Sequence, residues 1–141
     1  MEINNTTYPL NAFRLCIDGL GENLSGFIYT PLAKEPLTFR GMETFLELDI
    51  LYDKVGYPQS FQDKRSFEKT DEEINIYSGQ PDALMKPEDI IYKRGRRATF
   101  DVVVQSRCNT TWQGVILRDG TLDEEPFNGD LELWEKIERF A

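Results

Sequence analysis

Trp112 and Gln113 have side chains suited to holding a ligand. An indole ring can stack on a flat molecule, and a primary amide can both donate and accept hydrogen bonds. The alternative is a core strand in which Trp112 fills the interior and Gly114 lets a helix approach closely. Trp112 shares strand parity with Gly114 and Ile116, which favours the core alternative.

Arg65, Tyr57 and Gln59 form a second candidate binding group. A guanidinium can hold a carboxylate or phosphate through two parallel hydrogen bonds. The alternative is that Arg65 ties its segment to a carboxylate of a neighbouring helix, such as Asp49 or Asp53. Surface ion pairs of that kind are frequent and contribute little to stability, so the binding role stays a hypothesis.

Charged side chains cluster at two further places. Residues 93–97, Lys-Arg-Gly-Arg-Arg, could meet phosphates or an acidic partner, or form a solvated connector before a strand. Asp123, Glu124 and Glu125 could bind Ca²⁺ or Mg²⁺, but their spacing matches no EF-hand loop. The alternative is that these acids cap the helix that follows, where the helix dipole favours negative charge.

The chain contains no histidine, which excludes Ser-His-Asp and Cys-His catalysis as well as a His-based zinc site. Cys16 and Cys108 are too few for a Cys-rich metal site, and we expect both to be free thiols. Cys108 follows Arg107, and a nearby cation can lower a thiol pKa, which is a weak indication of a nucleophile. We therefore expect no metal and no cofactor.

Charge and hydropathy narrow the choice of partner and location. The 141 residues carry a formal charge of −9, so phosphate backbones are disfavoured as partners. The N-terminus lacks the basic and apolar regions of a secretory signal, and no apolar stretch is long enough to cross a membrane. These patterns predict a soluble cytoplasmic protein.

The first half of the chain predicts two strands and a helix. Residues 13–17 alternate in polarity, and residues 24–30 form a second strand after a glycine-containing loop. Helical spacing extends from residue 41 to about residue 55. A broad apolar helix face is expected to include Met42, Phe45, Leu46, Tyr52 and Val55.

The second half repeats this order. Residues 100–104 predict a strand, residues 107–110 a turn and residues 111–117 a return strand. A helix is expected from about residue 129 to residue 140. Its apolar stripe would contain Leu133, Trp134, Ile137 and Phe140.

Matching spacings suggest an internal duplication. In both halves a glycine lies 13 or 14 residues after the phenylalanine of the first strand, and another phenylalanine lies 13 residues after that glycine. We therefore expect an α+β fold in a single domain, residues 1–141. Two ββα halves, residues 10–56 and 97–141, would form a roughly four-stranded antiparallel sheet with two helices on one face. The connecting segment, residues 57–96, is expected to pack on the core.

The Thr-Trp-Gln-Gly sequence at residues 111–114 follows a Phe-x-Val-x-Val strand and precedes Leu-Glu-Leu at residues 131–133. This pattern resembles small uncharacterised proteins of Gram-positive anaerobic bacteria, in which a Trp-Gln-Gly strand is followed by a Phe-x-Ser-x-Leu-Glu-Leu-Leu helix start. Residues 57–67 are similar to the linker of their two-half members. Gly129 replaces a frequent Ser, and Leu117 lies where a Trp is expected. The resemblance implies a bacterial origin and this layout, and it assigns no catalytic residue.

The residues favour a non-catalytic binding or protein-interaction module whose partner is a protein or a small ligand. Two alternatives remain open. One is a small enzyme that uses carboxylate, Arg or Cys chemistry. The other is an acidic inhibitor that mimics nucleic acid through the carboxylates near the C-terminus.

Overall fold

The structure, a computed structural model, describes residues 8–56, 60–61, 83–108, 111–118 and 124–141. Its strands are β1 (Ala12–Gly19), β2 (Ser25–Tyr29), β3 (Leu37–Thr38), β4 (Ser60–Phe61), β5 (Ala98–Cys108), β6 (Thr111–Arg118) and β7 (Glu124–Asn128). Its helices are the short 3-10 helix η1 (Gly21–Asn23), α1 (Met42–Val55), α3 (Pro87–Ile91) and α4 (Asp130–Phe140). No helix in these ranges combines the length and apolar character that a membrane crossing requires.

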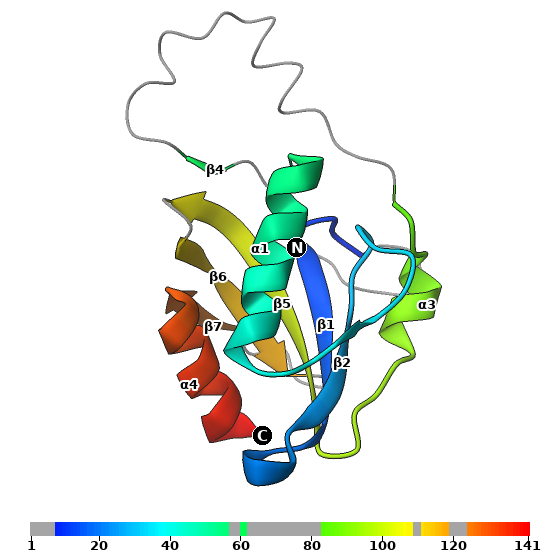
Figure 1. Cartoon of the computed structure of the whole chain (residues 1–141), viewed down its shortest axis with the longest axis vertical. Coiled ribbons are helices and arrows are strands. Elements are labelled where there is room, and N and C mark those ends of the chain that lie inside the picture. The colour runs from blue at the N-terminus through cyan, green and yellow to red at the C-terminus, as the bar shows by residue number, and fades with distance from the viewer. Residues whose placement is uncertain (1–7, 57–59, 62–82, 109–110, 119–123) are drawn as a thin grey trace, which may run out of the picture.

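The predicted α+β fold with an antiparallel sheet is confirmed (Figure 1). Six strands follow the order β3-β2-β1-β5-β6-β7, each antiparallel to its neighbours, and β4 adds a short parallel pairing to β5. The predicted number of four strands is therefore wrong. β3 has only two residues and β7 contains Pro126 among acidic residues, so neither has the alternating pattern that marks a strand.

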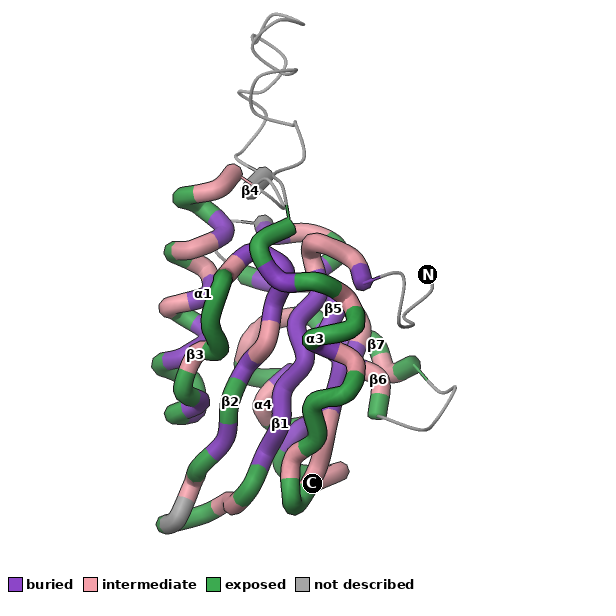
Figure 2. The backbone as a smooth tube through the Cα atoms, turned by 90° about the vertical axis from the view of Figure 1, so that its right-hand side faces the viewer, coloured by how far each residue is buried: buried purple, intermediate pink, exposed green. Residues whose placement is uncertain are grey.

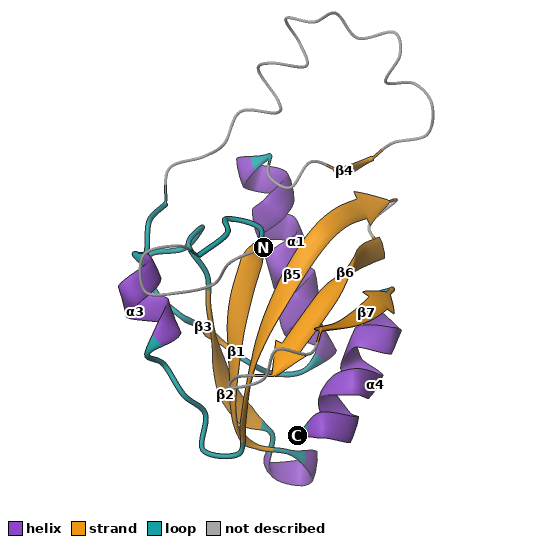
Figure 3. Cartoon of the chain, turned by 180° about the vertical axis from the view of Figure 1, so that it is seen from behind, coloured by secondary structure: helices purple, strands orange, loops and turns teal. Residues whose placement is uncertain are grey.

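The two faces of the sheet are covered by different elements. In β1, Phe13, Leu15 and Ile17 point to the face covered by α1 and α4, because side chains alternate along a strand. Ala12 points to the other face, where Ile90 of α3 packs. α3 thus lies across the sheet from the two long helices (Figure 3). Figure 2 shows that β1 is buried along most of its length.

The helix-covered face holds most of the aromatic core. α1 buries Phe45, Leu48 and Tyr52, and α4 buries Leu133 and Ile137. A set of rings packs with centroids 5.7–6.5 Å apart, and its members are Phe13, Phe39, Phe45, Tyr52, Trp112 and Trp134. Tilted contacts at this separation are favourable beyond the area that they bury.

The predicted apolar face of α1 is only partly correct. Phe45 and Tyr52 are buried and Val55 is half-buried, but Met42 and Leu46 are exposed. At 3.6 residues per turn, Met42 lies at the flank of the face that contacts the sheet, and Leu46 lies farther round toward solvent. The sheet covers a narrower stripe than the sequence pattern alone suggests.

A buried ion pair joins the two central strands on the α3 face. Arg14 of β1 lies directly opposite Asp101 of β5 and holds it with two hydrogen bonds of 2.9 and 2.7 Å. The Tyr8 hydroxyl donates to the same carboxylate at 2.8 Å. Arg14 also donates to the carbonyl of Ile91 at 2.5 Å, which ties the end of α3 to the sheet.

The connecting segment contributes to the core where the structure describes it. β4 pairs with the end of β5, with Ser60 opposite Arg107, and Met85 and Ile90 are buried on the α3 face. The prediction of a packed connection at residues 57–59 and 62–82 lies outside the described residues.

Two glycines permit close approach between neighbouring strands. A Cβ atom at Gly26 would lie closer than 3.0 Å to the carbonyl oxygen of Cys16, and one at Gly114 would lie even closer to that of Val103. Each glycine pairs beside an irregularity in the register, at Ile17 in β1 and at Val104 in β5. The expectation that Gly114 makes room for a helix is therefore wrong, because the neighbouring strand approaches it.

Replacing Gly114 with Ala is expected to lower the free energy of unfolding by about 3 kcal/mol, because the added methyl group meets backbone that cannot rotate away. Gly26→Ala should also lower the free energy of unfolding. Gly21→Ala is the control: its positive φ of 74° costs about 1 kcal/mol, but no atom lies within 4 Å. Urea denaturation of the three variants measures the difference. Equal stability of Gly114→Ala and Gly21→Ala would contradict the close approach.

Candidate functional site

The structure places two of the five predicted site residues. Trp112 is fully buried beneath α1, where its ring packs against Phe13, Phe45 and Tyr52. Gln113 is half-buried, and its amide oxygen accepts a hydrogen bond from Ser106 at 3.0 Å. A fully buried ring cannot stack on a ligand at the surface.

The other three predicted residues, Tyr57, Gln59 and Arg65, lie outside the described residues. Within the described residues, Asp49 and Asp53, the carboxylates proposed as partners of Arg65, are paired with a different arginine.

The arginine that pairs with Asp49 and Asp53 is Arg107. Its guanidinium lies 3.0 Å from the carboxylate of Asp49 and 2.8 Å from that of Asp53, one turn apart on α1. It also lies over the Tyr52 ring, 5.5 Å from the centroid. Trp112 completes the group, because its indole N–H donates to Asp49 at 2.9 Å.

The sequence pattern predicted a turn at Arg107, whereas β5 continues to Cys108. In a regular strand, Arg107 would point away from Phe100, Val102 and Val104. The register shift between Val104 and Ser106 reverses this alternation, as a β-bulge does, and Arg107 points toward α1. In the sequence, this buried cation was indicated only by Asp49 and Asp53, two carboxylates four residues apart on a predicted helix.

Asp130, the first residue of α4, is a third carboxyl group near this cluster. Burial raises the pKa of its carboxyl group, a backbone hydrogen bond with Trp112 lowers it, and the charge of Asp49 raises it. One carboxylate oxygen of Asp130 is buried without a hydrogen-bond partner among the described residues. The acids predicted to cap this helix, Glu124 and Glu125, lie in β7 instead.

Exposed apolar side chains follow α1 at intervals of four residues. Met42, Leu46 and Ile50 are 37%, 61% and 67% exposed, respectively. This spacing places them along one side of the helix. Asp49 and Asp53 project from nearly the same side as Met42 and Leu46, and Asp49 contacts Trp112 of β6, so this part of the stripe borders the side of α1 that faces α4. Ile50 projects farther from the sheet.

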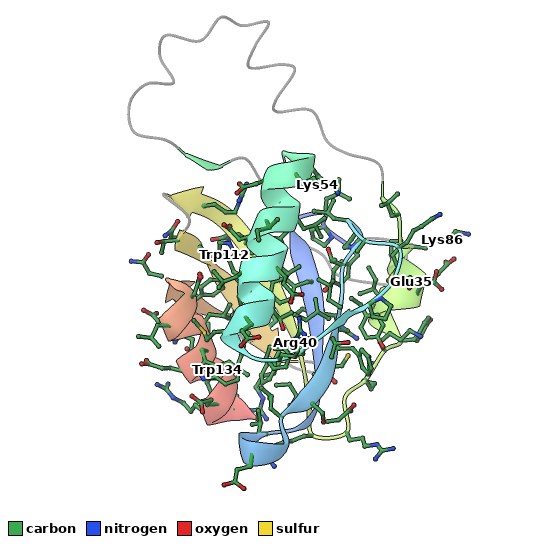
Figure 4. All side chains as sticks on the ribbon, in the orientation of Figure 1. Glu35, Arg40, Lys54, Lys86, Trp112 and Trp134 are labelled. Atoms are coloured by element: carbon green, nitrogen blue, oxygen red, sulfur yellow. The ribbon has the colours of Figure 1, made fainter. Side chains whose placement is uncertain are left out.

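α4 contributes apolar surface along its border with α1. Trp134 is half-buried and packs against Phe39 and Phe45, with ring centroids 5.8 and 6.5 Å away. Leu131, one turn before Trp134, is 64% exposed. Figure 4 shows Trp112 and Trp134 on this side of α1. We call this surface the α1–α4 seam, formed by Met42, Leu46, Ile50, Leu131 and Trp134.

The seam lies in strongly acidic surroundings. α1 and α4 together contain eight acidic and three basic residues. Within the described residues, some of these charges are paired: Arg40 with Glu47 of α1, Arg107 with Asp49 and Asp53 of α1, and Lys136 of α4 with Glu125. The remaining excess of carboxylates gives this face a negative potential.

The described residues offer little for nucleophilic or metal chemistry. Burial raises the pKa of the Cys16 thiol to about 12, so it is protonated at neutral pH and a poor nucleophile. The side chain of Cys108 lies outside the described part of the chain. Within the described ranges, no three Cys, Asp or Glu side chains are grouped so that they could hold a metal ion.

Comparisons of this chain with protein-family models, with curated proteins and with solved structures found no match. The site is therefore interpreted from its geometry and charge.

Trp112→Ala is expected to cost about 3–5 kcal/mol of stability, because it deletes a large buried ring and the donor to Asp49. Gln113→Ala, the neighbouring control, removes one half-buried hydrogen bond and should cost about 1 kcal/mol. Thermal and urea denaturation measure both. A Trp112→Ala variant that melts at the parent temperature would show that this ring is not part of the core.

Asp130→Asn should change how stability depends on pH. Because the carboxyl group has a raised pKa in the folded state, the folded chain binds this proton more tightly than the unfolded chain does. The group therefore lowers stability progressively as the pH rises from 3.8, the ordinary pKa of this carboxyl group, through its raised pKa in the folded state. The variant should therefore gain stability relative to the parent across that range. Urea denaturation over a pH series tests this, with Glu132→Gln as the control for losing another acid from the first turn. A constant difference between parent and Asp130→Asn would contradict the raised pKa.

Proposed function

We propose that this chain is a non-catalytic protein-interaction module that binds a basic, amphipathic segment of a partner protein along the α1–α4 seam. The observation that carries this proposal is the row of exposed apolar side chains on two neighbouring helices that are rich in carboxylates. An apolar patch with a charged rim is typical of surfaces that bind other proteins.

The spacing of the apolar side chains favours a helical or extended peptide as the bound element. Met42, Leu46 and Ile50 extend over more than two turns of α1, and Leu131 lies on the adjoining helix. Amphipathic helices bind in this way, with apolar anchors in a groove and charged groups at its edge. Carboxylates at the rim would select Lys and Arg on the partner and increase the rate of association.

The chain's own connecting segment matches this surface poorly in charge. Residues 62–82 contain six acidic and three basic residues, so their net charge has the same sign as that of the two helices. Like charges brought together across a surface cost free energy. Charge complementarity therefore favours a separate basic partner.

The row of exposed apolar side chains favours this function over the two alternatives. An inhibitor that mimics nucleic acid would need spaced carboxylates but no apolar stripe between them. Of the carboxylate, Arg and Cys groups that the enzyme alternative could use, the thiol of Cys16 is buried and protonated. We place the interaction in the cytoplasm, where a free thiol such as Cys16 is stable.

We further infer that the two halves arose by duplication of a βββα unit. The strand order reads outward from the β1–β5 pair as β2-β3 on one side and β6-β7 on the other, and a helix follows each third strand. Gly26 and Gly114 occupy equivalent close contacts in the second strand of each half. Gly41 and Gly129 precede the two helices with φ of 88° and 112°. On this proposal the seam lies between two equivalent helices.

The experiment that tests the proposed function measures binding of a synthetic amphipathic Leu/Lys helical peptide by fluorescence anisotropy. We expect saturable binding that weakens as salt is added. Replacing both Leu46 and Ile50 with Ser should weaken binding at least tenfold, about 1.4 kcal/mol, because two apolar anchors are lost without a change of charge.

Two controls distinguish binding at the α1–α4 seam from non-specific binding. Leu84 and Tyr92, 54% and 68% exposed, lie away from α1 and α4, and replacing both with Ser should leave affinity unchanged. A peptide with Glu in place of Lys should bind far more weakly. Absence of binding, or equal binding by polylysine without Leu, would reject an apolar docking site.

A further inference from the structure

The side of the sheet opposite the α1–α4 seam carries exposed aromatic and basic side chains. Phe27 of β2 and Tyr92, which directly follows α3, are 41% and 68% exposed. Phe27 points to the α3 side, because its neighbour Ile28 is buried in the core on the other side of the sheet. Three cations are exposed in the segment that leads from α3 to β5. We call this surface the basic face, and its members are Phe27, Tyr92, Lys93, Arg94 and Arg96.

Tertiary contacts hold the basic face in place. The backbone N–H of Arg96 donates to the carboxylate of Asp18 at 2.9 Å. The Lys93 ammonium lies 5.6 Å from the centre of the Tyr29 ring, and this ring packs against Phe27 with centroids 6.5 Å apart. Because the segment is already fixed on the sheet, little conformational freedom would be lost when a partner binds to it.

The basic face is a local positive surface in an acidic protein. Residues 86–97 contain five basic and two acidic residues, whereas the whole chain has a net charge of −9. Asp18 accepts its hydrogen bond from the backbone of Arg96 and not from the guanidinium group. Among the described residues, no carboxylate forms an ion pair with Lys93 or Arg96. Both side chains therefore present positive charge to solvent.

The α1–α4 seam has the complementary features. Glu43 lies three residues before Leu46 on α1, and Glu138 lies four residues after Trp134 on α4, so both carboxylates project beside the apolar side chains. Both are exposed, and neither forms an ion pair within the part of the chain that the structure describes. Apolar anchors bordered by carboxylates on one surface thus match aromatic rings bordered by cations on the other.

The two surfaces of one molecule cannot meet each other. The basic face lies on the α3 side of the sheet, and the seam lies on the side of the two long helices (Figure 3). A twofold dimer that joined both pairs of surfaces at once would need them on the same side. A contact between a seam and a basic face is therefore head to tail between two molecules.

We propose that the basic face binds the α1–α4 seam of a second copy of this chain, so that copies associate head to tail. This inference rests on the proposed function of the seam and names its partner, because residues 92–96 are themselves a basic segment with an aromatic anchor. Each bound copy still offers one seam or one basic face to the next copy. The surfaces are small, so the association is weak and reversible.

The net charge of each copy opposes association less than the local match favours it. At physiological salt the Debye length is about 8 Å, so most of the repulsion between two acidic copies is screened, whereas charges in direct contact are screened much less. A nucleic acid is disfavoured as the occupant, because three cations on a short segment do not form the continuous basic groove that follows a phosphate backbone.

Sedimentation equilibrium over a concentration series tests the association. The average mass of the parent should rise above 16.4 kDa with concentration, and about 1 M NaCl should lower it. Lys93→Glu with Arg96→Glu removes the charge of the basic face, and Leu46→Ser with Ile50→Ser removes apolar anchors of the seam. Each double variant should associate at least tenfold more weakly, with an unchanged melting temperature because all four positions are exposed.

Mixing the two double variants distinguishes a head-to-tail contact from other modes. One variant keeps an intact seam and the other keeps an intact basic face, so an equimolar mixture should form a dimer that does not grow further. Lys34→Glu with Lys86→Glu is the matched control, because it makes the same change of net charge at exposed positions outside the basic face. This control should associate like the parent.

Three results would overturn the proposal. These are a parent that stays monomeric up to about 1 mM, equal loss of association in the control, and a mixture of the two variants that stays monomeric. A monomeric parent that binds a single-stranded oligonucleotide through Lys93 and Arg96 would assign the basic face to nucleic acid instead.

Peptide binding separates this proposal from the proposed function. The variant with Glu at positions 93 and 96 should bind the Leu/Lys peptide like the parent, because its seam is intact. A monomeric parent that still binds the peptide would reject head-to-tail association alone. A parent that does not bind the peptide would reject the proposed function of the seam.

Discussion

The pairing of β1 with β5 is the constraint on which the rest of the structure depends. These strands are at the centre of the sheet, and their register brings Arg14 opposite Asp101. A shift of one residue would separate this buried pair and turn Phe13, Leu15 and Ile17 away from the two long helices. Such an ion pair need not add net stability, because desolvation opposes it, but it makes alternative registers costly. Its hydrogen bond to Ile91 extends the same constraint to α3.

The sheet determines how the two long helices, α1 and α4, are placed relative to each other. α1 follows the strands on one side of the central pair and α4 follows those on the other, and both pack on the same face (Figure 1). Arg107 joins the layers at one end by holding Asp49 and Asp53 against β5. Because the sheet buries only a narrow stripe of α1, Leu46 and Ile50 remain exposed. The candidate docking surface is a consequence of this geometry.

Charge is distributed unevenly over the molecule. Carboxylates dominate α1 and α4, whereas arginines gather where the last turn of α4 meets the ends of β5 and β6. The net charge of −9 therefore reflects the acidic surface of the two helices, whereas the region around the last turn of α4 and the ends of β5 and β6 is rich in arginine.

The sequence by itself determined the elements whose signals are local. Alternation in β1 and in residues 100–104, helical spacing in α1 and α4, and the absence of His followed from the residues, and so did the antiparallel α+β class. β3 and β7 were not predicted, because a two-residue strand and a strand containing proline become strands only through the neighbour that pairs with them. Of the candidate site, the strand parity of Trp112 favoured a place in the core, and the structure buries it there. That α1 is the element that covers it could not be read from the sequence.

Only the tertiary structure decided which surfaces are available. The register shift in β5 turned Arg107 toward α1, and a local pattern cannot reveal where alternation reverses. Likewise, Phe45 and Leu46 are both apolar but project about 100° apart on the helix, and only the packing of α1 on the sheet shows which of the two is covered. Arg97, Arg118 and Phe140 meet although they come from separate elements, because strand pairing and helix packing join residues distant in sequence. Properties that require two surfaces to meet are non-local, and for that reason the structure was needed to identify them.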